Sequence, residues 1–228
     1  MTLIQVIDAA RNLANEPLDS SRTFPDNTST FWKDSTLVTY FNMIQHDVEQ
    51  EIVQTFEDYF LTQTTLSIVS GCAGYTLPAR FMKVRRMEDF RGTGEPIEIH
   101  PITLNERGYN TSILVDDAGG GYVNRYSIRG NELVFDDTPT FTNASAIRMF
   151  YIRSLGDLSA GTESSDIPVE HHRVMVWGLY KMMLQQQQAD TTKADEEYQR
   201  QLLRVKTYCE NRQIQRPRRV KSGSLRGR

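Results

Sequence analysis

The sequence predicts an α+β protein: an α-helical bundle, made by the N- and C-terminal helices, is interrupted by a small antiparallel β domain and followed by an extended basic tail. Three observations favour this fold class. Apolar residues recur at helical spacing in both halves, alternate with a period of two in the middle, and become rare in a basic C-terminus. We therefore expect a first helical segment at 1–62, a β insertion at 63–155, a second helical segment completing the bundle at 156–212, and a tail at 213–228.

The N-terminal helices are predicted from capping and periodicity. Thr2 and Gln5 form a T-x-x-Q capping box, which predicts that the first helix begins at Thr2. A loop rich in proline and in Ser, Thr, Asp and Asn follows over 15–30. A second helix is predicted to begin at Asp34. One face of it is marked by residues three or four positions apart, namely Leu37, Phe41, Ile44, Val48, Ile52, Thr55 and Tyr59. Its other face carries Asp47, Glu49, Glu51 and Glu57.

Strands are predicted where the period changes to two, at about residue 63. Short strands are expected over 65–69, 82–87 and 96–102, and alternation at Ile147, Met149 and Tyr151 predicts another. A hairpin should join 126–128 to 133–135 through Gly130-Asn131, because this pair suits a tight turn. The polar, glycine-rich stretch from Asn110 to Gly121 is predicted to be a long exposed loop.

Two further helices are predicted after the loop at 156–165. Pro168 suits a first helical turn, and the segment from Val174 to Leu184 is apolar on most faces. Such a helix is central to its bundle or shared with a neighbouring subunit. The last helix should end near Arg212 and present one face made of Ala194, Tyr198, Leu202, Val205 and Cys209.

Charge is distributed unevenly along the chain. The net charge is -3, from 26 basic and 29 acidic residues. The tail at 213–228 holds six basic residues and no acid, so residues 1–212 carry 20 basic and 29 acidic residues, or -9. An acidic body with a basic tail predicts two surfaces with two different partners.

The composition also excludes several protein classes. No apolar run is long enough to span a membrane, and Met1 to Ala14 lacks the features of a signal peptide. The sequence therefore predicts a soluble protein made in the cytoplasm, with no membrane partner. Cys72 and Cys209 are too far apart in sequence for a disulfide framework and are expected to be ordinary thiols.

Candidate catalytic and metal-binding residues are few. His171 and His172 are adjacent, and neighbours on a helix diverge by about 100°, so we expect a surface or interface pair rather than metal ligands. His46 and His100 have no carboxylate or cysteine at a ligand spacing nearby. Gly119-Gly120-Gly121 lacks the Lys-Ser/Thr pair of a phosphate loop. We predict no catalytic residue, metal or cofactor.

Four local motifs, taken in order, resemble those of the head-to-tail adaptor family of tailed bacteriophages. The motifs are Phe31-Trp32-Lys33-Asp34-Ser35-Thr36-Leu37, Gly74-Tyr75-Thr76-Leu77-Pro78 followed by Phe81 to Val84, Tyr126-Ser127-Ile128 to Pro139, and Asp166-Ile167-Pro168-Val169-Glu170-His171-His172. With Ala194 to Tyr198 beginning a partner helix, the resemblance runs from Leu3 to about Arg212.

This resemblance implies a structural protein of the virion neck, between the capsid portal and the tail. It implies a ring of identical subunits, about twelve, that extends the DNA channel. The implied partners are the portal protein, tail or nozzle proteins, and double-stranded DNA that passes without sequence-specific binding. The acidic body suits this role, because negative walls repel phosphates and let DNA slide.

We expect two segments to bind partners. The resemblance implies a C-terminal segment that reaches onto the portal, and the cations there are Arg212, Arg216, Arg218, Arg219, Lys221, Arg226 and Arg228. In the long loop, the apolar residues Ile113, Leu114 and Val115 are expected to contact a neighbouring subunit or a tail protein.

Two alternative functions stay open. The first is a nucleic-acid-binding protein that acts through the basic tail. The second is a neck protein with peptidoglycan-hydrolase activity, in which Asp116-Asp117 and Asp136-Asp137 supply the pair of carboxylates that glycoside cleavage requires.

Overall fold

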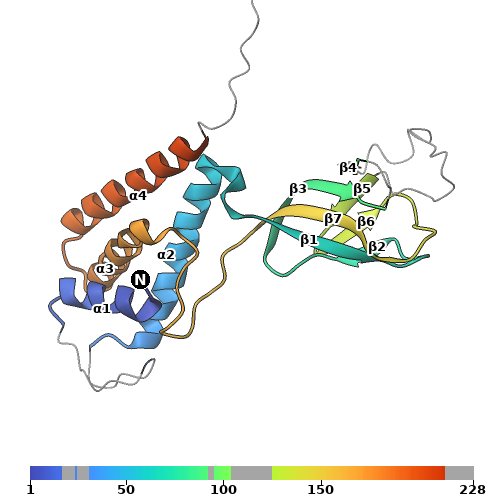
Figure 1. The fold of residues 1–228 in the computed structure, drawn as a ribbon. Helices are drawn as coiled ribbons and strands as arrows, with labels where there is room; N and C mark the ends of the chain where they lie inside the picture. Colours follow the sequence, from blue (N-terminus) through green and yellow to red (C-terminus); the bar gives the residue numbers. More distant parts are fainter. Residues whose placement is uncertain (17–23, 25–30, 92–94, 104–124, 214–228) are drawn as a thin grey trace, which may run out of the picture. The chain divides into compact units, whose positions relative to one another are not determined.

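The computed structural model describes residues 1–16, 24, 31–91, 95–103 and 125–213. Over these residues the protein has four α-helices and seven β-strands (Figure 1), which confirms the predicted mixed α+β composition. The chain divides into two compact units, one made of Met1–Tyr59 with the residues from Leu155 onward, and the other of Phe60–Ser154. The first is a helical unit and the second a β unit.

The helical unit contains α1 (Leu3–Leu13), α2 (Asp34–Thr55), α3 (Arg173–Gln186) and α4 (Thr192–Gln213). Helix α3 packs against the other three helices, and α2 also packs against α4. This arrangement follows from the apolar faces, because α3 has buried residues on most of its circumference while α4 buries one stripe. The buried residues include Leu3, Ile7, Leu37, Phe41, Val174, Leu179, Met183, Leu202 and Val205.

Gly178 is the point where α3 comes closest to its neighbours. A β-carbon at this position would lie 2.7 Å from Cγ2 of Ile44 on α2 and 3.1 Å from Cε2 of Tyr198 on α4. Real β-carbons essentially never come as close to another heavy atom as the 2.7 Å to Ile44, and the 3.1 Å to Tyr198 is tighter than most, so the missing side chain of Gly178 allows the three helices to pack at this spacing.

A buried ionic network joins the end of α1 to the start of α2. Arg11 is 0 % exposed, and its Nη2 donates to the carbonyl of Trp32 and to Oδ1 of Asp34, both at 2.6 Å. Its Nη1 lies 3.2 Å from Oε2 of Glu16. Because a buried charge is tolerated only when it is paired and hydrogen-bonded, this network fixes the two helix ends relative to each other.

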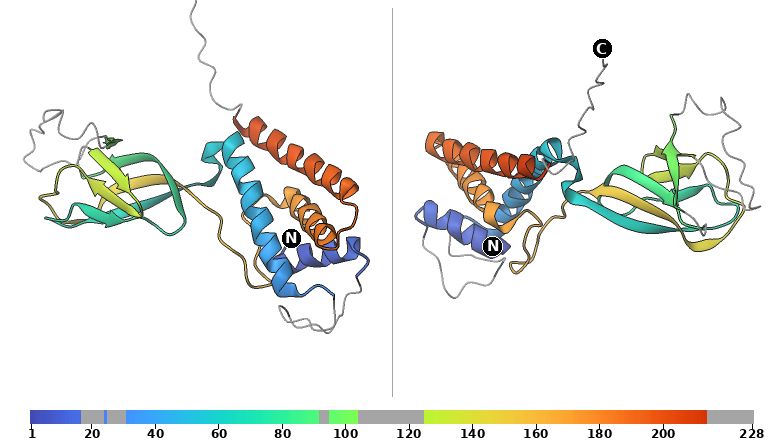
Figure 2. Two further views of the ribbon diagram at one scale, coloured as in Figure 1. Left: turned by 180° about the vertical axis from the view of Figure 1, so that it is seen from behind. Right: turned by 45° about the horizontal axis from the view of Figure 1, so that its top comes forward.

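The β unit is one sheet with the strand order β1-β7-β3-β4-β5-β6-β2, and Figure 2 gives two further views of it. Its strands are β1 (Leu61–Ile68), β2 (Gly74–Thr76), β3 (Phe81–Asp89), β4 (Ile97–Pro101), β5 (Arg125–Arg129), β6 (Glu132–Phe135) and β7 (Asn143–Arg153). They enclose an apolar core that contains Ile68, Met87, Ile99, Tyr126, Leu133, Phe135, Ile147 and Met149.

The expectation of a purely antiparallel domain is wrong at one pair of strands. Strands β4 and β5 run parallel, with His100 opposite Arg125 and Pro101 opposite Tyr126. A parallel pair needs a connection of a dozen residues or more, and the segment between Pro101 and Arg125 has that length. Alternation of side chains gives no strand direction, so the pattern alone could not predict this pairing.

The predicted hairpin is confirmed. Strands β5 and β6 pair with Arg129 opposite Glu132, and Gly130 has a φ of 58°. Glycine adopts this left-handed conformation without the strain that a β-carbon introduces, which explains its place in the turn.

Several element boundaries differ from the predicted ones. Helix α2 ends at Thr55 and Tyr59 lies in a 3-10 turn at Glu57–Phe60, so Tyr59 does not continue the apolar stripe of α2. Strand β1 begins at Leu61, earlier than expected. Its first residues were not predicted as strand, because polar Thr and Gln side chains lie on both faces and show no apolar alternation. Strand β2 is only three residues long, too short for a periodic pattern.

At the start of α1 one bond of the predicted capping box is present. The backbone N–H of Thr2 donates to Oε1 of Gln5 at 3.0 Å. This bond satisfies a donor that the first turn of a helix otherwise leaves without an intrahelical partner.

Candidate functional site at the end of the last helix

The expected partner-binding residues fall in three places. Arg212 lies in the last turn of α4, directly before the basic tail. The other tail cations lie outside the described residues, namely Arg216, Arg218, Arg219, Lys221, Arg226 and Arg228. So do the loop residues Ile113, Leu114 and Val115, and their expected roles stay predictions.

Arg212 is held by two aromatic rings of the helical unit. Its guanidinium carbon lies 5.4 Å from the ring centre of Tyr59 and 5.5 Å from that of Tyr208. A guanidinium within about 6 Å of an aromatic ring is attracted by the electron density of its face. These contacts join the last turn of α4 to the turn after α2, and so fix the point from which the basic tail leaves.

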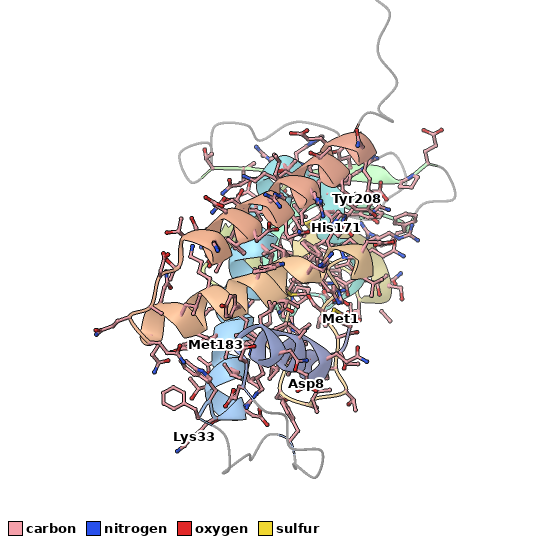
Figure 3. All side chains as sticks on the ribbon, turned by 90° about the vertical axis from the view of Figure 1, so that its left-hand side faces the viewer. Met1, Asp8, Lys33, His171, Met183 and Tyr208 are labelled. Atoms are coloured by element: carbon pink, nitrogen blue, oxygen red, sulfur yellow. The ribbon has the colours of Figure 1, made fainter. Side chains whose placement is uncertain are left out.

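His171 completes this arrangement. Its ring meets that of Tyr208 edge-on with 4.8 Å between ring centres, and Figure 3 shows the two labelled side by side. We call Tyr59, His171, Tyr208 and Arg212 the tail-root cluster. The rings come from three separate segments of the sequence, which explains why no local pattern predicted their meeting.

Burial shifts the pKa values of the ionisable groups in and beside the tail-root cluster. Burial raises the pKa of Tyr59 to about 12. Burial likewise raises the pKa of the Cys209 thiol to about 11, and it lowers the pKa of His171. At neutral pH Tyr59 and the Cys209 thiol are therefore protonated and His171 is neutral, so none of the three carries a charge beside the guanidinium of Arg212.

Among the described residues, the net negative charge lies in the helical unit. Its described residues comprise 9 basic and 17 acidic side chains, or -8, whereas those of the β unit comprise 9 basic and 7 acidic, or +2. The six cations of the tail therefore follow directly after the acidic unit. An acidic unit followed directly by a basic tail is consistent with two binding surfaces that prefer partners of opposite charge.

A second polar site, which the sequence did not predict, lies on one face of α2. Asn42 and Leu158 exchange two hydrogen bonds of 3.0 Å, and Gln45 Nε2 donates to the carbonyl of Gly156 at 2.9 Å. The backbone N–H of Leu155 donates to Oε1 of Glu49 at 2.7 Å. We call Asn42, Gln45 and Glu49 the α2 clasp, because they hold the backbone of the segment that leads into the loop before α3.

Glu49 and His46 correct two expectations. The sequence places Glu49 on the open face of α2 with other acids, but it is 2 % exposed.

His46 is expected to have no nearby carboxylate, but its Nδ1 lies 2.8 Å from Glu49 Oε2 and its Nε2 lies 2.9 Å from Asp157 Oδ1. Burial lowers the pKa of His46, but its hydrogen bonds to the two carboxylates outweigh this and raise the pKa above 6.5. The spacing of 42, 45, 46 and 49 on one helical face was the available signal.

His172 corrects a third expectation. The sequence predicts that it lies at a surface or interface, yet it is 1 % exposed. Its Nε2 lies 2.7 Å from the carbonyl oxygen of Ile167, which can only accept, so Nε2 carries the proton. Burial lowers the pKa of His172, and the ring is therefore neutral inside the helical unit.

Other candidate sites gain no support from the described residues. Within these residues no three His, Cys, Asp or Glu side chains are grouped as metal ligands. Asp136 lies 3.6 Å from the guanidinium of Arg125, while Asp116-Asp117 and Gly119 to Gly121 lie outside the described residues. Cys72 is exposed, Cys209 is buried, and the two are not joined. None of the helices that the structure describes is long and apolar enough to cross a membrane.

A comparison with protein families decides the assignment. The family described as SU10 adaptor protein matches residues 1–225, which is nearly the whole chain. The chain belongs to the SU10 adaptor protein family. No curated protein matches the sequence.

Membership confirms the resemblance to phage head-to-tail adaptors. SU10 adaptor proteins are structural components of the virion that interact with other head and tail components. The match also includes both the tail-root cluster and most of the basic tail, so these features lie within the family region rather than in an appended segment.

Proposed function

We propose that this SU10 adaptor protein forms a ring of about twelve identical subunits with closed cyclic symmetry between portal and tail. The ring extends the DNA channel in the neck and offers a docking surface to tail or nozzle proteins. The observation that carries this proposal is the family match over residues 1–225.

The division of charge supports a role for the helical unit near DNA. With a net charge of -8 over its described residues, this unit repels phosphates rather than retaining them. A channel wall that bound phosphates tightly would hold the genome back, since each neutralised phosphate adds to the affinity. An acidic wall instead lets double-stranded DNA pass without sequence-specific contacts.

The basic tail is proposed to bind the portal. Arginines can make two parallel hydrogen bonds to one carboxylate, and four of the six cations lie within Arg216 to Lys221. Exposed ion pairs contribute about 0–1 kcal/mol each. Twelve tails on one ring nevertheless act together, because each bound subunit raises the effective concentration of the next.

Ring formation is proposed to depend on the portal. A tail with few apolar side chains cannot repay the entropy of its own ordering, so its ordering is coupled to a partner. The free protein is then largely monomeric. Mixing it with portal and measuring mass by analytical ultracentrifugation tests this, and stable rings of the free protein would contradict it.

One observation favours a second function. The acid-free tail also fits nucleic acid, for which affinity should fall steeply with salt. Measuring DNA binding of the isolated protein between low and moderate salt distinguishes the two functions. An adaptor binds portal at moderate salt and DNA weakly, whereas a nucleic-acid-binding protein shows the reverse.

A further inference from the structure

His46, beside the α2 clasp, has a carboxylate at each of its two ring nitrogens. Its Nδ1 lies 2.8 Å from Oε2 of Glu49, and its Nε2 lies 2.9 Å from Oδ1 of Asp157. A carboxylate oxygen accepts hydrogen bonds, so each contact requires a proton on the ring nitrogen. A neutral imidazole carries only one such proton. The geometry is therefore that of the protonated ring, which donates in both directions.

The two carboxylates differ in their access to water. The side chain of Glu49 is 3 % exposed, whereas that of Asp157 is 73 % exposed. A buried acceptor that loses its donor is destabilised, whereas water replaces the donor of an exposed one. When the ring loses a proton, the proton should therefore leave Nε2, and Nδ1 should keep its bond to Glu49. The contact with Asp157 is the one that a rise in pH breaks.

The charges that act on His46 come from these two acids. Burial lowers the pKa of His46, but its hydrogen bonds to Glu49 and Asp157, together with their negative charge, outweigh burial and raise the pKa above 6.5. No charged side chain of α1, α3 or α4 among the described residues contributes to this shift, and neither does the exposed Asp47, the next residue of α2. Below this pKa both contacts of the ring are present, and above it only the contact with Glu49 stays.

The contact with Asp157 holds a segment that follows the β unit. Strand β7 ends at Arg153, and the α2 clasp bonds the backbone of Leu155, Gly156 and Leu158. Asp157 lies within this bonded stretch. Losing its contact with His46 therefore removes one of the attachments between the stretch and α2.

The same loop is also attached to α1. The N–H of Leu3 donates to the carbonyl of Glu163 at 2.7 Å, and the N–H of Ile4 donates to the carbonyl of Gly161 at 3.1 Å. These bonds satisfy donors that the first turn of a helix leaves without an intrahelical partner. The loop 155–163 is thus attached to α2 at one end and to α1 at the other, and His46 acts on the α2 end.

We propose that His46 is a pH-dependent latch on this loop. The protonated ring fastens Asp157 to α2 and so stabilises the neighbouring backbone bonds of the α2 clasp. When Nε2 loses its proton, Asp157 turns to water and the clasp opens more often, while the attachment to α1 is kept. The latch lies within the helical unit and goes beyond the proposed function, because it does not depend on ring formation.

The tautomer of His46 tests which contact is broken. The ¹⁵N chemical shifts of its imidazole are followed by NMR in the full-length protein during a pH titration, and His46→Gln assigns the signals. Both nitrogens should carry a proton at acid pH. Above the pKa, Nδ1 should keep its proton and Nε2 should be bare, whereas the opposite tautomer would overturn the release of Asp157.

Amide hydrogen exchange tests whether the clasp opens. The protection factors of the Leu155 and Leu158 amides are measured relative to an unstructured chain at the same pH, which removes the ordinary dependence of exchange on pH. They should fall about two- to fivefold as His46 loses its proton, the range for a charged contact with one exposed partner. The amides of Leu3 and Ile4 are the internal control and should keep their protection.

Two variants with the same change of charge separate the latch from a general effect of charge. Asn at position 157 can accept from a protonated Nε2 and donate to a bare one, so Asp157→Asn should make the protection of Leu155 and Leu158 independent of pH. Asp47→Asn removes the same charge from the exposed side of α2 and should leave the pH dependence as in the wild type.

The outcomes decide the latch independently of the adaptor role, because none of these measurements requires the portal. Protection that does not change with pH in the wild type overturns the latch, and so does an equal change in Asp157→Asn. An equal loss of protection at Leu3 and Ile4 overturns it as well, because the whole loop would then loosen rather than its α2 end.

Discussion

Replacing Gly178 by alanine sets two effects of opposite sign against each other. Alanine favours a helix over glycine by about 1 kcal/mol, and Gly178 lies inside α3. The new β-carbon would, however, lie 2.7 Å from Cγ2 of Ile44 and 3.1 Å from Cε2 of Tyr198. Both distances are shorter than the optimum of about 3.5–4.0 Å between carbon atoms.

The clash should win. Overpacking a core costs about 1–3 kcal/mol, and the upper part of this range applies when the contacted atom cannot move. Cγ2 of Ile44 belongs to a β-branched side chain, whose χ1 is nearly fixed in a helix. Subtracting the gain in helix propensity leaves an expected loss of about 1–2 kcal/mol in the free energy of unfolding.

Urea unfolding followed by circular dichroism measures this loss. Ile44→Ala removes the contacted atom, so Gly178→Ala should cost little or even stabilise in that background, with a coupling of about 1–2 kcal/mol. Gly74→Ala is a suitable control, because among the described residues its β-carbon would meet only Oε2 of Glu132, at 3.9 Å. A stabilising Gly178→Ala in the wild type, or an equal cost in both backgrounds, would refute the steric explanation.

Further predictions concern the histidines, the tail-root cluster and the tail. Folding raises the pKa of His46, so the stability that its protonated ring contributes is complete below pH 6.5 and is lost as the pH rises through the pKa in the folded protein. The difference in the free energy of unfolding between wild type and His46→Gln, measured in urea, should shrink over this pH range. Folding lowers the pKa of His172, so the stability that its neutral ring contributes is complete above pH 6.5 and falls as the pH drops toward the pKa in the folded protein. The free energy of unfolding of His172→Gln should therefore fall less at acid pH than that of the wild type. Arg212→Gln removes a contact with two rings worth about 0.5–1 kcal/mol and should speed hydrogen exchange in the last turn of α4, whereas unchanged exchange would show that the rings do not hold it. Deleting 213–228 should leave the melting temperature unchanged and abolish co-sedimentation with portal; retained co-sedimentation at moderate salt with lost DNA affinity would show that the tail contacts the genome.

The features predicted correctly are those that a local period encodes. The stripe of α2 from Leu37 to Ile52 is buried, and so are Ala194, Leu202, Val205 and Cys209 of α4. In both helices the spacing of three and four residues is itself the cause of burial, because it places the side chains on one face. The hairpin turn at Gly130 was predictable for a similar reason, since the backbone conformation there requires glycine.

The errors concern contacts between distant segments. In the sequence, Glu49 stands among the acids of a polar helix face. It is a buried acceptor because the backbone of Leu155 approaches it and donates a hydrogen bond to its carboxylate. His172 is buried because Ile167 supplies a carbonyl acceptor, and the parallel pairing of β4 with β5 depends on the path of a long connection. The candidate site was predicted only in part, because Tyr59 and Tyr208 meet around Arg212 from helices far apart in sequence.

The pairing of Leu61 with Ile152 has a consequence for how such a protein can change. The strand that carries the chain into the β unit and the strand that carries it out are immediate neighbours, so the two cut points of the insertion lie a strand spacing apart. A short turn could therefore bridge Phe60 to Arg153 without stretching the helices on either side. The β unit is thus exchangeable as a cassette: a gene could acquire, lose or replace it by recombination while the helical core continued to fold.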